Sequence, residues 1–171
     1  METVNQFQQE FVKNASYRMD ESFRMIKICL DQLSEEMIWK KPNASTNSIG
    51  NLILHLCGNI TQYGIASLQH LDDQRNRDEE FAISTGYDRT ALLQKLETTV
   101  EEAKHTFWEV PISELLSERS VQGFRFSGIG NIVHVVEHFS YHTGQIALWT
   151  KILNNKDLGF YSGIDLTIKN E

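Results

Sequence analysis

Three histidines spaced four residues apart are the side chains of this sequence best placed to do chemistry. His134, His138 and His142 lie in the apolar segment GNIVHVVEHFSYHTGQIALWTKIL, residues 130–153. In an α-helix, side chains four apart share a face and lie about 6 Å from each other along the axis. Two such imidazoles can bind one metal ion, whose bonds to nitrogen are about 2.0–2.1 Å long. The outer two are roughly 12 Å apart along the axis, so one adjacent pair is predicted to chelate, with a third ligand from another helix.

His55 is the predicted third ligand. It lies in IGNLILHLCGN, a second apolar segment, where a buried polar group without a hydrogen-bond partner costs about 1–3 kcal/mol. A single histidine in such a segment is most often a core residue bonded to a neighbouring side chain or carbonyl. A chelating pair together with a histidine in another apolar segment instead favours a shared metal site.

The pattern resembles the DinB-like superfamily of metal-binding four-helix bundles. The residues that carry the resemblance are His55 in the second predicted helix, and His138 and His142 within EHFSYHTGQI of the last one. Trp39 and Pro42, in LSEEMIWKKPNASTNSIGNLILHL, match the stretch that leads into the second helix of the family.

The resemblance covers about residues 5–153 and implies that the last two histidines of the row, not the first two, chelate the metal with His55. Neutral imidazoles suit Zn, Ni, Fe or Cu, so the ligands leave the identity of the divalent metal open. Three protein ligands leave an open coordination position, as in catalytic zinc sites. Glu137 and Gln145 flank the histidines and are candidates for hydrogen bonds to them, although a solvated helix face is the simpler role for Glu137.

The resemblance implies chemistry of two kinds: transfer of a low-molecular-weight thiol to a small electrophile, or metal-assisted hydrolysis. Metal coordination deprotonates a thiol and lowers the pKa of water toward 7. Cys29 and Cys57 lie in apolar helical patterns and are predicted to be buried free thiols. The reacting thiol is therefore expected to be a cosubstrate such as bacillithiol, mycothiol or glutathione. The alternative is a non-enzymatic bundle in which the metal stabilises a dimer, and no catalytic residue is assigned.

Four helices are expected to position these residues, so the predicted fold class is all-α, a four-helix bundle. They span about residues 4–33, 48–71, 88–110 and 129–153. Apolar residues recur three and four apart in the first helix, and Ser48, Asp88 and Ser127 are predicted N-caps of the others. The second helix is apolar nearly all round and is expected to be central.

The connections between these helices are predicted to be mostly polar. Residues 72–88 form a long exposed crossover between the second and third helices, in which Arg75 and Arg77 belong to a solvated mixture of charges. Residues 111–128 are expected to begin with a short turn capped by Ser113 and to continue as an extended strip. The tail, residues 154–171, is expected to cover a bundle end or a partner subunit.

A second metal motif is rejected. Glu102 and His105 match the E-x-x-H pattern of carboxylate di-iron bundles. Those sites need two such motifs and two further glutamates, and this sequence has no second E-x-x-H.

Composition limits the class of protein further. The 171 residues fit one domain, 1–171, and a net charge of −7 argues against a nucleic-acid partner. No apolar run approaches the ~20 residues of a membrane helix, and the start lacks a signal peptide, so a cytoplasmic protein is expected. Because the second and fourth helices are apolar over more than one face, we expect a homodimer that covers the surplus apolar surface.

Overall fold

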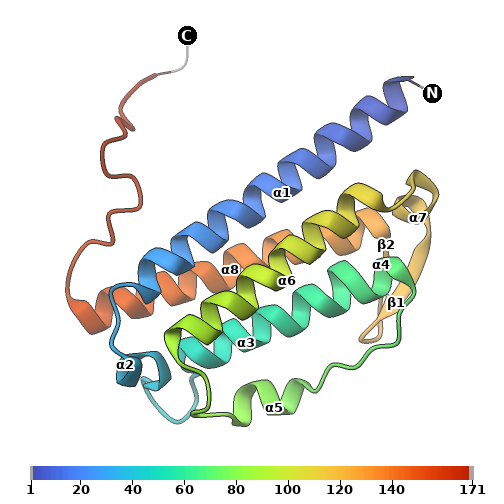
Figure 1. Ribbon diagram of the computed structural model, residues 1–171. Helices are drawn as coiled ribbons and strands as arrows, with labels where there is room; N and C mark the ends of the chain where they lie inside the picture. The colour runs from blue at the N-terminus through green and yellow to red at the C-terminus, as the bar shows by residue number, and fades with distance from the viewer. Residues whose placement is uncertain (1, 170–171) are drawn as a thin grey trace.

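Four long helices form the bundle in the computed structural model, which describes residues 2–169 (Figure 1). The first is α1, Glu2–Leu30, and the third and fourth are α6, Arg89–Glu109, and α8, Gly128–Asn154. The second is made of three consecutive pieces: α3, Ile49–Asn59, the π-helix η1, Ile60–Ala66, and α4, Ser67–Gln69. The predicted all-α bundle with a long connection between its second and third helices is confirmed.

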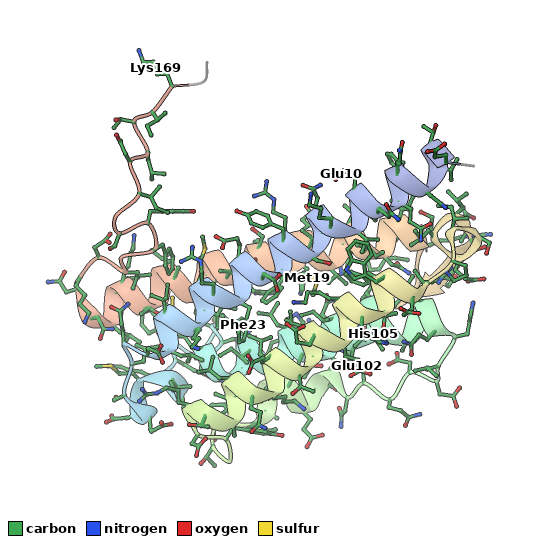
Figure 2. All side chains as sticks on the ribbon, turned by 45° about the horizontal axis from the view of Figure 1, so that its top comes forward. Glu10, Met19, Phe23, Glu102, His105 and Lys169 are labelled. Carbon is green, nitrogen blue, oxygen red and sulfur yellow. The ribbon has the colours of Figure 1, made fainter. Side chains whose placement is uncertain are left out.

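The apolar face of α1 packs against α8 and α6 and contributes one wall of the core. Its inward residues recur at helical spacing, and Met19 is fully buried while Phe23 packs beside it at the edge of the core (Figure 2). The buried residues of this helix are Val12, Ala15, Met19, Ser22, Ile26, Cys29 and Leu30. The helix ends three residues earlier than expected, but Leu33 is still buried in the turn that follows.

The second helix departs from the uninterrupted helix predicted for residues 48–71. It begins as expected, with Ser48 and Asn51 forming a reciprocal capping box. From Ile60 to Ala66 the turns widen to the π form, and the helix ends at His70 in the left-handed conformation. A π-turn has no hydrophobic period of its own to be recognised in a sequence, and such turns are frequent at functional sites.

The crossover, residues 72–88, is not the fully exposed segment that the sequence predicted. It contains a short helix, α5, Arg77–Ala82, which begins at an Asn76 cap and lies against α3. The Asn51 side-chain amide donates hydrogen bonds to the carbonyls of Glu80 (3.0 Å) and Ile83 (2.6 Å). This buried asparagine supplies hydrogen-bond donors to carbonyls at the end of α5 and fixes α5 to the bundle.

A β-hairpin interrupts the connection between α6 and α8. After α7, Ile112–Leu116, strand β1, Glu118–Val121, pairs antiparallel with β2, Phe124–Ser127. The turn residues Gln122 and Gly123 both have positive φ, which suits a two-residue hairpin. The expected extended strip is therefore paired, and α7 begins after Pro111 rather than at a Ser113 cap.

Helix α2 and the C-terminal tail lie at the same end of the bundle (Figure 1). Helix α2, Glu35–Trp39, begins at a Ser34 cap, and Trp39 lies over Gly50 with its indole N–H bonded to the Tyr87 carbonyl at 3.1 Å. The tail packs through Leu158 and then leaves the bundle (Figure 1). No helix within residues 2–169 has the length and apolar character to cross a membrane.

Candidate metal centre

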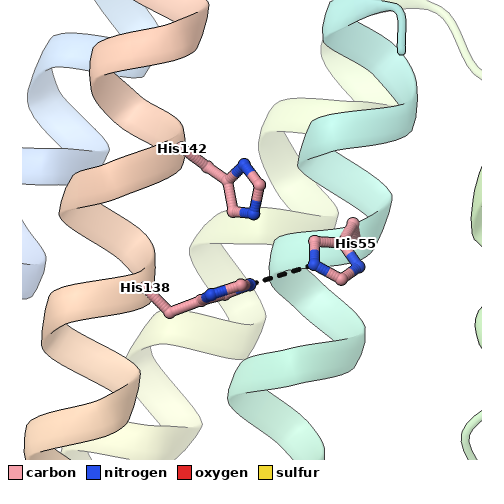
Figure 3. Close-up of side chains that lie close together, drawn as sticks. All are labelled: His55, His138 and His142. Carbon is pink, nitrogen blue, oxygen red and sulfur yellow. Dashed lines mark hydrogen bonds between the residues drawn. The ribbon is translucent and has the colours of Figure 1, made fainter. Parts of the chain in front are cut away.

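Three imidazoles from two helices converge inside the bundle. His55 comes from α3, and His138 and His142 come from successive turns of α8 (Figure 3). The Nε2 atoms of His55 and His138 are 2.9 Å apart, and one nitrogen from each of the three rings lies within 4.8 Å of the others. The predicted combination of ligands is therefore brought together in space, with His134 outside the group.

The spacing of the His55 and His138 nitrogens is close to that around a small divalent ion. For bonds of about 2.0–2.1 Å at a tetrahedral centre, neighbouring nitrogens lie about 3.3 Å apart. The 2.9 Å between His55 and His138 requires only a small separation of the rings. His55 and His142 are 5% and 8% exposed, whereas His138 is only half-buried and opens to the surface. Solvent or a substrate would therefore reach the site on the side of His138.

Each buried ligand has an oxygen acceptor for its other ring nitrogen. Nδ1 of His55 lies 2.9 Å from a Glu80 carboxylate oxygen, and Nδ1 of His142 lies 2.7 Å from the Gln145 amide oxygen. Both contacts favour the tautomer with hydrogen on Nδ1, which leaves Nε2 free to bind a metal. Gln145 reaches His142 because a residue three positions along a helix lies on the same face.

Burial keeps the two ligands of α8, His138 and His142, unprotonated. It lowers the pKa of His138, and the neighbouring histidines act in the same direction, so that together they bring it to about 3. Burial also lowers the pKa of His142, although its hydrogen bond to Gln145 acts in the opposite direction. Near neutral pH the imidazoles of His138 and His142 therefore carry the lone pairs that a metal ligand requires.

Glu80 is the functional candidate that sequence reasoning missed. It is buried and forms a two-point ion pair with Arg75, with N···O distances of 2.7 and 2.9 Å. Burial raises the pKa of Glu80, but hydrogen bonds from Arg75 and His55 outweigh this effect and hold it below the usual value. Asn76 followed by Glu79 is a helix-start signal that could have revealed α5. Nothing local, however, shows which acid of that helix faces inward.

His134 takes a different position from the three converging rings. It is nearly parallel to the His138 ring at 5.4 Å between centroids, and packs against Tyr63 at 4.2 Å. Its Nε2 lies 3.2 Å from the Asn59 side-chain nitrogen. Burial lowers the pKa of His134 as well. It forms part of the wall beside the site rather than part of the cluster.

Glu137 is exposed on α8, beside the site but away from its centre. With His134, His138, Ser140 and Tyr141 it lines a surface recess of about 470 Å³. Within residues 2–169 it makes no hydrogen bond to a histidine, which agrees with the simpler role of a solvated side chain. Glu102 and His105 are exposed on α6 (Figure 2), and neither belongs to the histidine cluster.

Four long helices with one long crossover give the chain the same bundle fold as solved DinB-like proteins. The family model described as "Protein of unknown function (DUF1572)" matches residues 6–164, and the chain belongs to this family. Among curated proteins, none matches the chain significantly.

Solved structures show the same fold at low sequence identity. A conserved protein from Enterococcus faecalis matches with a TM-score of 0.72 and 16% identity, over 84% of this chain and 97% of that one. The DinB-like protein YjoA of Bacillus subtilis matches with a TM-score of 0.65 and 14% identity, over 84% and 94% of the two chains. A DinB-like protein of Bacillus cereus gives 0.67 and 13%, over 85% and 91%.

Proposed function

We propose that this protein is a metal-dependent enzyme that transfers a low-molecular-weight thiol to a small electrophile. The observation that supports the proposal is the convergence of His55, His138 and His142, each with a ring nitrogen within 4.8 Å of the others. His138 lies on the side of the cluster that opens to the surface. Three neutral imidazoles suit Zn, Ni or Fe and leave a coordination position for a further ligand. When bound, such an ion would favour the thiolate form of a thiol placed beside it.

The residues of the chain supply binding and orientation in this proposal. Glu80 and Gln145 orient the imidazoles of His55 and His142, and the recess beside His138 is open to a small molecule. Tyr141 lies at this recess and is 62% exposed, so its ring offers a surface against which a substrate can pack. The polar side chains that the reaction would use therefore lie together at one site between apolar helices.

The two cysteines do not supply the reacting thiol. Burial raises the pKa of Cys57 to about 12 and that of Cys29 to about 11, and both are free and buried. The thiolate is the reactive form, and neither residue lines the recess beside His138. An external cosubstrate, such as bacillithiol, mycothiol or glutathione, is the thiol that this arrangement suits.

A homodimer is part of the proposal. Leu148 and Ile152 are each at least 60% exposed and, being four residues apart, form an apolar stripe on one face of α8. Covering this stripe would remove an apolar surface that a monomer leaves in water.

The test combines metal content with conjugation. Protein purified without a histidine tag is analysed for bound metal, then incubated with each thiol and a chromogenic electrophile across a panel of zinc, nickel and iron. We expect about one ion per chain and thiol conjugation in the wild type, and neither in His138→Ala. His105→Ala is the matched control, because it removes an exposed histidine of α6 that lies outside the cluster.

Equal conjugation rates with wild type, His138→Ala and no protein would refute the transferase. The same panel with ester and amide substrates then distinguishes a hydrolase from a non-enzymatic bundle. Undiminished metal in His138→Ala would refute the metal centre itself.

A further inference from the structure

The crossover between the second and third bundle helices reaches into the metal centre from outside the four-helix core. Arg75, on the crossover, and Glu80, on α5, have side chains that are only 5% and 10% exposed. Glu80 contacts Nδ1 of His55 at 2.9 Å, and the Arg75 guanidinium lies 3.0 Å from the same nitrogen. The crossover, which is separate from α3, therefore contacts His55 on the side of its Nδ1 atom.

The pair is part of a chain of hydrogen bonds that continues back to α3 and η1. Arg75 donates to the Gln62 amide oxygen at 2.9 Å, and the Gln62 amide donates in turn to Asp73 of the crossover. The guanidinium thus has acceptors on both sides. Because Arg75 and Glu80 are both nearly buried, each depends on the other for charge compensation.

A glycine makes room for this pair. Gly58 is three residues after His55, and a Cβ built on it would lie 2.0 Å from a Glu80 carboxylate oxygen and 2.9 Å from Nε of Arg75. Any larger residue would push the pair away from α3. The backbone of α3 therefore forms the surface against which the ion pair lies, one turn from the candidate ligand.

We propose that Arg75 and Glu80 are positioning residues of the metal centre, and that metal binding is coupled to docking of the crossover, here residues 72–87, the part before the Asp88 cap of α6. This inference rests on the metal site of the proposed function. Glu80 accepts the Nδ1 hydrogen of His55 and so directs Nε2 toward the ion. Arg75 compensates the negative charge of Glu80 and, through its hydrogen bond to Gln62, fixes the pair to η1. An ion that needs His55 in this orientation favours the docked crossover, and a docked crossover favours the ion.

Removing the carboxylate has a larger consequence than the loss of one hydrogen bond. In Glu80→Gln the Arg75 guanidinium stays buried, close to His55, without its counter-charge. Loss of an outer hydrogen-bond partner of a metal ligand usually costs 10–100-fold in metal affinity. The uncompensated cation acts in the same direction, so we expect the zinc affinity of this variant to fall by about 100-fold.

The experiment measures zinc affinity and hydrogen exchange on the full-length chain, with zinc ions alone as the probe. Competition against a chromophoric chelator gives the affinities of the wild type, Glu80→Gln and Glu79→Gln. Glu79 is the matched control, since it is the neighbouring carboxylate on the same short helix and is exposed. In the wild type, zinc is expected to slow amide exchange of residues 72–87, and in Glu80→Gln this protection is expected to be lost.

A second pair of variants tests whether the ion pair needs the space above Gly58. Gly58→Ala is expected to weaken zinc binding and to raise exchange of the crossover, because the new methyl displaces Glu80 and Arg75. Gly144→Ala meets no atom within 4 Å and is expected to leave both unchanged.

The outcomes separate this inference from the metal site on which it rests. A wild type that binds no zinc overturns both. Zinc binding that is as tight in Glu80→Gln as in the wild type, or that leaves exchange of residues 72–87 unchanged in the wild type, overturns the positioning role alone. The exchange measurement on the wild type needs no variant, so a variant that fails to fold does not remove the test.

Discussion

The choice between two possible chelating pairs on α8 is open to a direct measurement. His134 with His138 has the same spacing as His138 with His142, yet only the second pair converges with His55. We therefore predict that His142→Ala loses most of the stabilisation by zinc and that His134→Ala keeps it. The assay is thermal unfolding of each protein with and without zinc, with chelator added to show that the effect is reversible.

The size of the effect follows from where the ligands lie in the chain. His55 and His138 are 83 residues apart, so the complete cluster exists only in the folded protein. A ligand that binds only the folded state at a concentration of 100 times Kd stabilises it by about 2.7 kcal/mol. For a chain of this length, each kcal/mol corresponds to about 2–4 °C in Tm, so zinc is expected to raise Tm of the wild type by about 5–11 °C.

Loss of one ligand removes most of that increase. If His142→Ala weakens binding by about 100-fold, the same zinc concentration is close to Kd and the stabilisation falls to about 0.4 kcal/mol. The expected shift is then about 1–2 °C. His134→Ala should lower Tm without zinc, because the ring packs on Tyr63, but should retain the full increase. A lost shift in His134→Ala with a retained shift in His142→Ala would show that the other pair binds the metal.

Three other predictions concern the thiols, the core and the assembly. Raised pKa values of about 11 and 12 leave about one part in a thousand or less of Cys29 and Cys57 as thiolate at pH 8. Ellman's reagent should therefore react with them at least 100-fold more slowly than with glutathione until the protein is unfolded. Rapid reaction of the native protein would contradict their burial. Gly50→Ala places a methyl 2.7–2.8 Å from the ring of Trp39, which should cost about 1–3 kcal/mol in denaturant unfolding, whereas Gly144→Ala, with open space above it, should stabilise by up to about 1 kcal/mol. Sedimentation of dilute protein should give twice the chain mass of 19.7 kDa, and the mass of a single chain would refute the dimer.

The parts of the fold that could be predicted are those with local signals. The helices of the bundle follow from apolar residues at helical spacing, and the caps at Ser48, Asp88 and Ser127 are all observed. The π-turns of η1 and the pairing of β1 with β2 lacked such a signal. Both depend on how the chain packs rather than on a repeat in the sequence.

The same distinction runs through the candidate site. His138, His142 and Gln145 lie on successive turns of one helix, so their relative positions follow from helical spacing alone. His55 had to be inferred from its apolar surroundings and from resemblance. Glu80 was missed because its burial depends on Asn51, 29 positions away, and on the space above Gly58.

The two halves of the cluster are therefore held in place by different parts of the fold. The α8 half is held by a single 27-residue helix and needs no other element to set its spacing. The His55 half depends on α3, on a buried ion pair and on a crossover whose own helix is only six residues long. Short elements that dock through a few contacts open at lower free energy than long core helices. Variation in metal affinity should therefore arise mainly from the side of His55, where a docked crossover and a correctly oriented imidazole form together.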